Sequence, residues 1–254
     1  MLGLRRYFAN SFTAGFYSSM GPGKKQSEDA YLITSDMLSV ADGVGGWISY
    51  GVDPSKYAWE LMKNIADTEK ALKSERLSTK ILTQAANDCK IRGSSTCSLI
   101  LLHPTLGSLD TLNIGDSGFF IYRKTGKAYK LIEKSKETLH GFNHPYQLGT
   151  NGDKVESAWT KIIEIKDKDV VIMYSDGLTD NLYEDTIMEI INKECAEKVN
   201  VENTAKALGE KAYEMCQDTK YISPFAKAYM EGYKGGKPDD ITVVVALINL
   251  EKEA

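Results

Sequence analysis

Four stretches of the chain place an aspartate beside small residues at the end of an apolar, strand-like run. They are Val40-Ala41-Asp42-Gly43, Ile114-Gly115-Asp116-Ser117, Tyr174-Ser175-Asp176-Gly177 and Pro238-Asp239-Asp240-Ile241. Taken singly, each aspartate is more often a helix cap or a turn residue. The repeated context indicates one carboxylate cluster with Asp42 at its centre, in a loop whose glycines let the backbone approach a ligand.

Acids at predicted strand ends are too numerous to lie together without compensation, because like charges raise each other's pKa and oppose folding. Divalent cations would relieve that repulsion, and oxygen-only ligands favour Mg²⁺, Mn²⁺ or Ca²⁺ over zinc. Two such ions about 3.5–4 Å apart can clamp a phosphoryl group for in-line displacement. The acids concerned are Glu28, Asp29, Asp42, Asp116, Asp176, Asp180, Asp239 and Asp240.

Other phosphate chemistries lack their sequence signatures. No cysteine is followed six residues later by arginine, and Gly115-Asp116 is not followed by the histidine of dinuclear His/Asp phosphoesterases. Neither a Walker A loop nor a Gly-x-Gly-x-x-Gly motif occurs, so nucleotide binding has no support. The four cysteines are scattered, which disfavours structural zinc and a disulfide framework and fits a reducing compartment.

Length, net charge and composition limit the kinds of partner that the chain can have. Its 254 residues carry a formal net charge of −4, which argues against nucleic acid as the main partner. No apolar run approaches the roughly 18 residues that a transmembrane helix needs. Residues 1–10 contain two arginines and no acid, a composition that suits a targeting segment or an extension. Residues 11–254 are expected to form a single domain, since no linker or internal repeat interrupts them.

The pattern of elements predicts an α+β fold. Short β-branched runs are expected as strands and helical periodicities as helices. Asp53-Pro54 is a good helix start, with a capping aspartate before proline. The segment 221–237, rich in glycine, aromatic residues and lysine, is expected to be a surface excursion. Expected strands are 11–18, 30–35, 37–41, 96–102, 108–114, 119–123, 128–132, 160–165, 170–174 and 241–250; expected helices begin near 54, 78, 184 and 202.

Six motifs in order resemble the metal-dependent type 2C protein serine/threonine phosphatases, over nearly the whole chain from about residue 11. Further stretches, Gly45-Gly46-Trp47, Ser223-Pro224-Phe225-Ala226 and Gly235-Gly236-Lys237, resemble the mitochondrial branch of that family. The six motifs are Ser27-Glu28-Asp29-Ala30, Ala41-Asp42-Gly43-Val44-Gly45-Gly46, Gly93-Ser94-Ser95-Thr96, Asn113-Ile114-Gly115-Asp116-Ser117, Ser175-Asp176-Gly177-Leu178-Thr179-Asp180-Asn181 and Pro238-Asp239-Asp240-Ile241-Thr242.

The resemblance implies a four-layer α-β-β-α sandwich of two antiparallel sheets flanked by helices. It also implies two Mg²⁺ or Mn²⁺ ions at one end of the sandwich, and positions that in some members of the family hold a weaker third ion. Asp42 would bridge the first two ions, with Asp176 and Asp239 completing one site. Glu28 and the Gly43 carbonyl would complete the other. By the same matching, Asp116 and Asp180 hold the third ion, and Asp29 and Asp240 orient the water ligands.

Two positions depart from the family pattern. Where the family commonly has an arginine that holds the substrate phosphate, this chain has Lys24. A lysine lacks the bidentate fork of arginine. Lys25 could share the binding of phosphate, or Lys24 could be a solvated turn residue. Where many members have a histidine that protonates the leaving group, this chain has Val44, which cannot do so.

The resemblance implies a phosphatase that hydrolyses phosphoserine and phosphothreonine in phosphoprotein substrates through a water activated by two metal ions. A catalytically inactive scaffold that binds phosphoproteins or metabolites is the alternative, and a hydrolase of small phosphoesters is a more distant one. The branch resemblance predicts a mitochondrial location, with the cytoplasm as the alternative. We expect a monomer.

Overall fold

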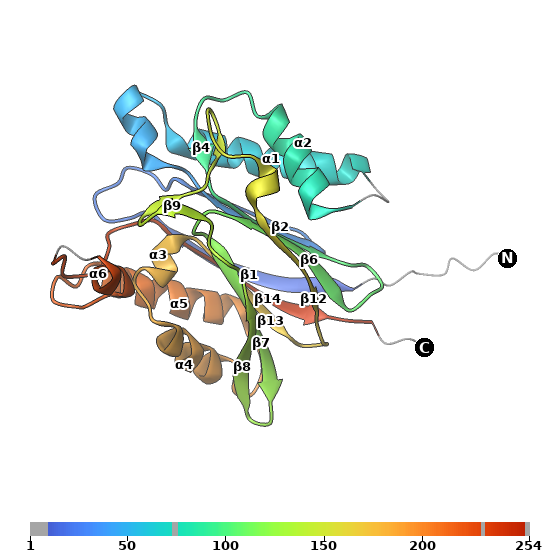
Figure 1. Ribbon diagram of the computed structural model, residues 1–254. Helices are drawn as coiled ribbons and strands as arrows, with labels where there is room; N and C mark the ends of the chain where they lie inside the picture. The colour runs from blue at the N-terminus through green and yellow to red at the C-terminus, as the bar shows by residue number, and fades with distance from the viewer. Residues whose placement is uncertain (1–9, 73–75, 230–231, 252–254) are drawn as a thin grey trace.

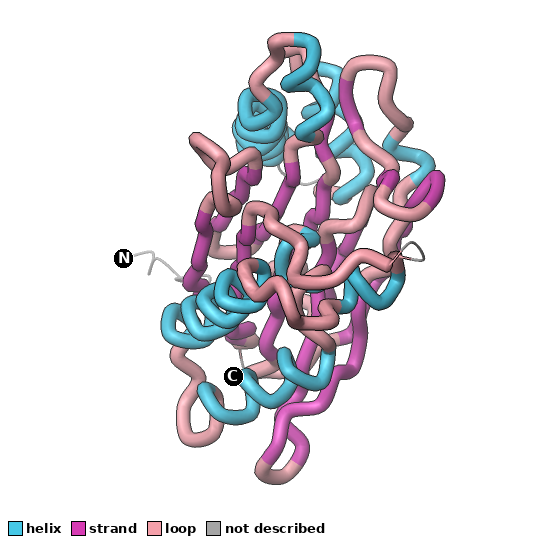
Figure 2. Tube along the Cα trace, turned by 90° about the vertical axis from the view of Figure 1, so that its left-hand side faces the viewer, coloured by secondary structure: helices cyan, strands magenta, loops and turns pink. Residues whose placement is uncertain are grey.

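Two five-stranded antiparallel sheets pack face to face, and helices cover the outer face of each (Figure 1). The computed structural model describes residues 10–72, 76–229 and 232–251. Figure 2 views the molecule from the end where α3 and α6 lie in Figure 1, and loops dominate that end. The α+β sandwich predicted from the sequence is confirmed.

Both sheets are built from antiparallel neighbours. The first has the order β1 (Ser11–Ser19), β14 (Ile241–Asn249), β13 (Val170–Tyr174), β7 (Gly118–Thr125), β8 (Ala128–Lys134). The second has the order β12 (Trp159–Glu164), β6 (Ser108–Ile114), β5 (Cys97–Leu102), β3 (Met37–Asp42), β2 (Asp29–Ile33).

Helices α1 and α2 pack on the second sheet, and α4 and α5 pack on the first (Figure 1). The helices are η1 (Gly45–Tyr50), α1 (Pro54–Leu72), α2 (Ser78–Asp88), η2 (Val155–Ser157), α3 (Asp176–Thr179), α4 (Glu184–Glu194), α5 (Val201–Cys216) and α6 (Pro224–Ala228). Short strands form two small ribbons: β4 (Ser94–Ser95) with β11 (Leu148–Gly149), and β9 (Leu139–Gly141) with β10 (His144–Pro145).

The alternation of side chains between the two faces of each strand explains the layers of the fold. In β3, Met37 and Ala41 face the α1/α2 layer, whereas Leu38 and Val40 pack between the sheets. The same division occurs in β14, where Val243 joins the α4/α5 core and the next residue joins the core between the sheets. Because successive strand side chains point to opposite faces, a fully apolar strand must be buried on both sides. Each sheet therefore lies inside the molecule.

The register of the strands brings the predicted acids to one end. Asp29 pairs with Asp42 across β2 and β3. On the other sheet, Ser175 follows β13 and its amide donates to the Thr242 carbonyl of β14 at 3.0 Å. The Ser175 hydroxyl then donates to Asp29 Oδ2 at 2.7 Å, which joins the two sheets at this end.

Some sequence predictions need correction. The glycine loop after Asp42 contains the 3₁₀ helix η1, and residues 133–158, for which no element was expected, carry η2 and parts of both ribbons. The expected surface excursion 221–237 is wrong in part, because it holds α6 and its Gly235 and Gly236 are buried. The targeting segment predicted at residues 1–10 lies almost wholly outside the described residues. Within those residues, none of the helices combines the length and apolar character needed to cross a bilayer.

Candidate metal centre

Asp42 lies at the end of β3 on the wall of a cavity of about 500 Å³. Its amide donates to Thr96 Oγ1 at 3.0 Å, which fixes the end of the strand. Burial raises the pKa of Asp42 well above its usual range, and the charges of Asp29, Asp176, Asp239 and Asp116 raise it further. Acids from both sheets therefore act on this one carboxylate.

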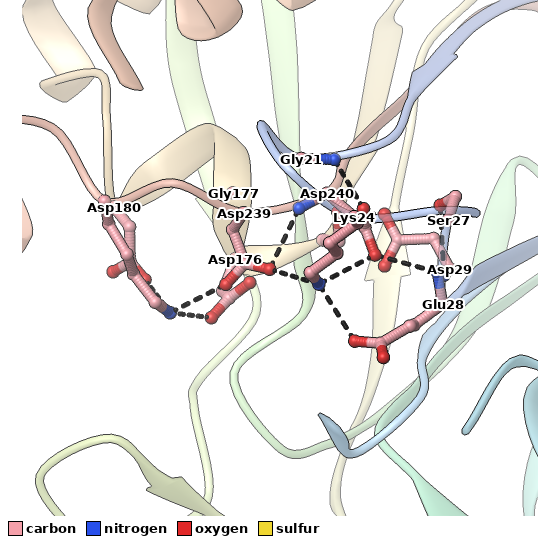
Figure 3. A network of polar contacts seen from close by, with 12 residues as sticks. Gly21, Lys24, Ser27, Glu28, Asp29, Asp176, Gly177, Asp180, Asp239 and Asp240 are labelled. Atoms are coloured by element: carbon pink, nitrogen blue, oxygen red, sulfur yellow. Dashed lines mark hydrogen bonds and ion pairs between the residues drawn. The ribbon is translucent and has the colours of Figure 1, made fainter. Parts of the chain in front are cut away.

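Lys24 occupies one side of the acidic site (Figure 3). Its ammonium donates to Glu28 Oε2 at 2.9 Å, to Asp239 Oδ1 at 3.0 Å and to Asp240 Oδ2 at 2.9 Å. Burial lowers the pKa of Lys24, but the charge of Asp239 and the hydrogen bonds to the acids outweigh burial, so the net pKa is raised. Lys24 is thus held in its charged form between acids of two distant chain segments.

Asp240 connects that side of the site to the backbone. Its Oδ1 accepts from the Gly21 amide at 2.6 Å, and its Oδ2 accepts from the Glu28 amide at 2.7 Å (Figure 3). Both bonds join segments more than 200 residues apart in the chain. Asp240 therefore positions the loop that carries Lys24 and Glu28.

Lys237 occupies the other side of the site, and sequence analysis did not single it out. Its ammonium lies 2.5 Å from Asp176 Oδ2, 2.5 Å from Asp180 Oδ2 and 3.3 Å from Asp239 Oδ2. Burial tends to raise the pKa of Asp176, but the adjacent Lys237 charge outweighs burial and holds it below its usual range. The signal in the sequence was a lysine two residues before Asp239, within a motif already matched to the family.

Asp116 and Asp180 act electrostatically with Asp176, but their pKa values are raised whereas that of Asp176 is lowered. Burial raises the pKa of Asp116 to about 7, with Asp176 adding to the effect. The pKa of Asp180 is raised by burial and by Asp176, and Lys237 only partly offsets this. Glu137, an acid that sequence analysis missed, lines an adjoining cavity of about 290 Å³ with these three acids, and burial raises its pKa as well. No element was expected around residue 137, so nothing in the sequence placed it here.

The charge and the donor type of this site suit divalent cations. Asp29 Oδ1 and Asp176 Oδ1 are buried and have no hydrogen-bond partner among the described residues. Two ammonium groups form ion pairs with five of the eight predicted acids, which leaves a negative excess that oxygen-seeking cations would neutralise. Within the described part of the chain, no three His, Cys, Asp or Glu side chains are already arranged around one point. Lys24 and Lys237 lie between the carboxylates instead.

Close backbone packing fixes the loops that carry the acids. A Cβ at Gly43 would lie 2.6 Å from the Pro54 carbonyl oxygen and 2.8 Å from that of Glu28. A Cβ at Gly177 would lie 2.0 Å from the Asp240 carbonyl oxygen. Only glycine fits such approaches, which explains the Asp-Gly pairs at residues 42–43 and 176–177.

Comparisons with known proteins agree with this geometry. A family model described as "Stage II sporulation protein E (SpoIIE)" matches residues 57–249. The "Protein phosphatase PTC7 homolog" of Xenopus laevis is 34% identical over an alignment of 237 positions, and the match covers 85% of this chain and 77% of that protein. The chain belongs to the PPM, or type 2C, family of protein phosphatases. It is a phosphoprotein hydrolase.

Solved structures of phosphatases share the fold. The photosystem II phosphatase PBCP has a TM-score of 0.85 and 27% identity, with 94% of this chain and 100% of that chain covered. The catalytic domain of the serine threonine protein phosphatase PstP, solved in complex with two manganese ions, has a TM-score of 0.67 and 18% identity. That match covers 94% of this chain and 99% of the other. Its identity is low enough that it supports the fold alone.

The phosphatase brings most of the predicted site residues together. The 500 Å³ cavity is lined by Lys24, Glu28, Asp42, Gly43, Val44, Asp116, Asp176, Lys237 and Asp239, among others. Asp180 borders the adjoining cavity, while Asp29 and Asp240 are buried behind the lining residues. Lys25 is exposed and does not line the cavity, so its predicted share in phosphate binding has no contact to support it.

Proposed function

We propose that the protein is a Mg²⁺- or Mn²⁺-dependent phosphatase of phosphoserine and phosphothreonine residues. The observation that carries the proposal is the position of Asp42. Its acidic neighbours come from both sheets, and burial together with their charges raises its pKa. A cation beside Asp42 would remove that electrostatic cost. Two Mn²⁺ ions in the PstP structure agree with the choice of metal, although that likeness reaches only the fold.

The chain would hold two ions through oxygen atoms on either side of Asp42. Asp42 would be shared, Asp176 and Asp239 would serve one ion, and Glu28 with the Gly43 carbonyl would serve the other. Asp116 and Asp180 match the positions of a third ion. Bound ions of this kind supply a nucleophilic water at neutral pH and stabilise charge on a phosphoryl group.

Residues of the chain have separate tasks around those ions. Asp29 is positioned by the Ser175 hydroxyl and Asp240 by two backbone amides, so both are held ready to orient ligands. Lys24 would contact the phosphate of the substrate. Cations that neutralise Glu28 and Asp239 would release its ammonium from them for this contact. Val44 lines the cavity and supplies no proton.

The alternative of an inactive binding scaffold is less well supported. Such a relative would be expected to have lost at least one of Asp42, Asp176 and Asp239, and this chain has all three. They also lie on one cavity in the described structure. We therefore infer turnover rather than binding alone.

Phosphate release from a phosphothreonine peptide tests the proposed function. We expect release with Mn²⁺ or Mg²⁺, none with excess chelator, and recovery when the metal is restored. Release that persists in chelator would rule out the metal-dependent reaction, and binding of the peptide without release would favour the scaffold.

A mitochondrial location rests on the resemblance of the chain to the PTC7 homologues and on its N-terminal composition. Residues 1–30 fused to a fluorescent reporter should direct it to mitochondria, and the full-length protein should go there too. Diffuse cytosolic signal from both proteins would contradict this location.

A further inference from the structure

Lys237 is held in its position by the backbone on either side of it. Its amide donates to Asn181 Oδ1 at 2.8 Å, and its carbonyl accepts from Asn181 Nδ2 at 3.0 Å. Asn181 is fully buried and its Nδ2 also donates to the Gly177 carbonyl at 3.0 Å. Pro238 follows and restricts the backbone of Lys237 further. The lysine is thus fixed to the same short segment that carries Asp176 and Asp180.

The side chain of Lys237 is equally confined. Only 14% of it is exposed, and its Nζ lies 5.1 Å from the centre of the Phe225 ring. The amide of Phe225 in turn donates to the Asp180 carbonyl at 3.1 Å. An aromatic face attracts an ammonium group. Phe225 therefore adds to the attraction that holds the ammonium in place.

The contacts of this ammonium overlap with the predicted third metal position. Lysine has three donors and no acceptor, and here three carboxylates face them, those of Asp176, Asp180 and Asp239. Asp180 is one of the two acids that match the third metal position, and its Oδ2 is already engaged by Lys237. A divalent ion beside Asp180 would lie within a few ångströms of a fixed positive charge.

We infer that the ammonium of Lys237 takes the place of the third metal ion, so that the phosphatase binds two divalent cations rather than three. The inference rests on the proposed function, since it presupposes that the first two ions bind. Lys237 would then act through the acids that it contacts and not on the substrate itself. It supplies permanently, and without dependence on metal concentration, the charge that a weak third ion would supply only at high concentration.

Equilibrium dialysis of the purified full chain against Mn²⁺, with metal counted per protein, tests the inference without an activity readout. The wild type should bind two ions over a wide concentration range. Lys237→Met should bind a third ion, with an affinity on the order of 100-fold higher than at any third site of the wild type, because a like charge has been removed. Lys237→Arg should still bind two. Lys234→Met, a change to an exposed lysine nearby, should match the wild type.

Removal of Asp180 provides a second test, and its measurement in the wild-type background does not depend on the folding of Lys237→Met. Asp180→Asn in the wild-type background should leave the count at two, and in the Lys237→Met background it should abolish the third ion. A wild type with three ions, a Lys237→Met variant with two, or an Asp180→Asn variant that loses an ion would overturn the inference. A wild type that binds no Mn²⁺ would contradict the proposed function itself.

Discussion

Lys24 and Lys237 each bring an ammonium group against three acidic side chains of the same site, and Asp239 contacts both. They differ in what holds them. Lys24 follows Gly23, whose φ is +84°, in an open turn, and 28% of its side chain is exposed. Lys237 is half as exposed, with a buried asparagine on its backbone and an aromatic ring beside its ammonium.

This difference separates two roles that the contacts alone do not distinguish. A lysine on an exposed, glycine-containing turn can exchange a carboxylate for a phosphate at low cost, because little packing opposes its movement. A lysine fixed at both its backbone and its side chain cannot. We therefore assign the substrate phosphate to Lys24 and a permanent structural charge to Lys237.

The largest effect is expected from Asp176→Asn, which removes the acid that Lys237 holds ionised. Turnover of a phosphothreonine peptide should fall to the assay background, while far-ultraviolet circular dichroism stays native, because Lys237 keeps Asp180 and Asp239 as acidic partners. Asp185→Asn, on the exposed start of α4, is the matched control and should keep full turnover. Equal turnover in both variants would show that the acidic site is not the reaction centre.

Lys24→Met should raise the KM for a phosphopeptide by about 10- to 100-fold, the usual value of a hydrogen bond to a charged group. The Mn²⁺ count should stay at two. Lys25→Met should change KM by less than about twofold, because Lys25 is exposed and lies outside the cavity. Steady-state kinetics of both variants measure this. Equal increases in KM would mean that the two lysines share the phosphate and that the open turn does not single out Lys24.

Val44→His should raise turnover of a phosphothreonine peptide several-fold and leave that of an aryl phosphate nearly unchanged. An aryl oxide leaves without a proton, whereas an alkoxide needs one. A well-positioned general acid contributes roughly 10²–10⁴-fold, and a single substitution without supporting contacts should give less. A comparable gain on the aryl phosphate would mean that the new imidazole acts other than by protonation.

The histidines of the chain provide the control for position 44. His140 lies 3.0 Å from Asp153 and its ring contacts those of His144 and Tyr146, and neither histidine is among the residues that line the acidic cavity. Alanine at His103, His140 or His144 should therefore leave peptide turnover intact. Selective loss of peptide turnover in one of these variants would identify another proton donor and remove the reason for the Val44→His gain.

The smallest effect is expected from Phe225→Leu, which removes the ring beside Lys237. A double-mutant cycle with Lys237→Met, read from urea unfolding, should give a coupling energy of about 0.5–2 kcal/mol. A coupling near zero would mean that the ring does not stabilise the ammonium. The distinction between the two lysines would then rest on Asn181 alone.

Local patterns were sufficient to predict the layers of the fold. In β13 and β14 every residue but Tyr174, Thr242 and Asn249 is apolar, which predicts burial on both faces and hence a sheet inside the molecule. The start of α1 at Pro54 follows from Asp53, whose Oδ1 accepts from the Ser55 amide at 3.1 Å. Such features depend on neighbours in the chain, so the sequence is enough to find them.

Most acids of the site could be predicted to lie together because they flank a strand, whereas Asp180, at the end of α3, was assigned through the family motif. Lys237 could not be predicted in this way, since its role depends on Asn181 and Phe225, which the fold brings to it from other segments. Glu137 and α6 lie in segments with no clear periodicity, so their contribution to the site appears only with tertiary structure. The open turn of Lys24 was visible in its glycines, but its three acidic contacts were not.

The thermal unfolding midpoint of wild type and Asp42→Asn, each with and without Mn²⁺, tests most directly whether the acidic site exists to bind cations. We predict that Mn²⁺ raises the midpoint of the wild type by mass action. Metal-free Asp42→Asn should unfold at or above the metal-free wild type, because a buried repulsion is gone. It should respond little to Mn²⁺. A wild type indifferent to Mn²⁺, or an Asp42→Asn variant with the full wild-type response, would contradict the metal centre.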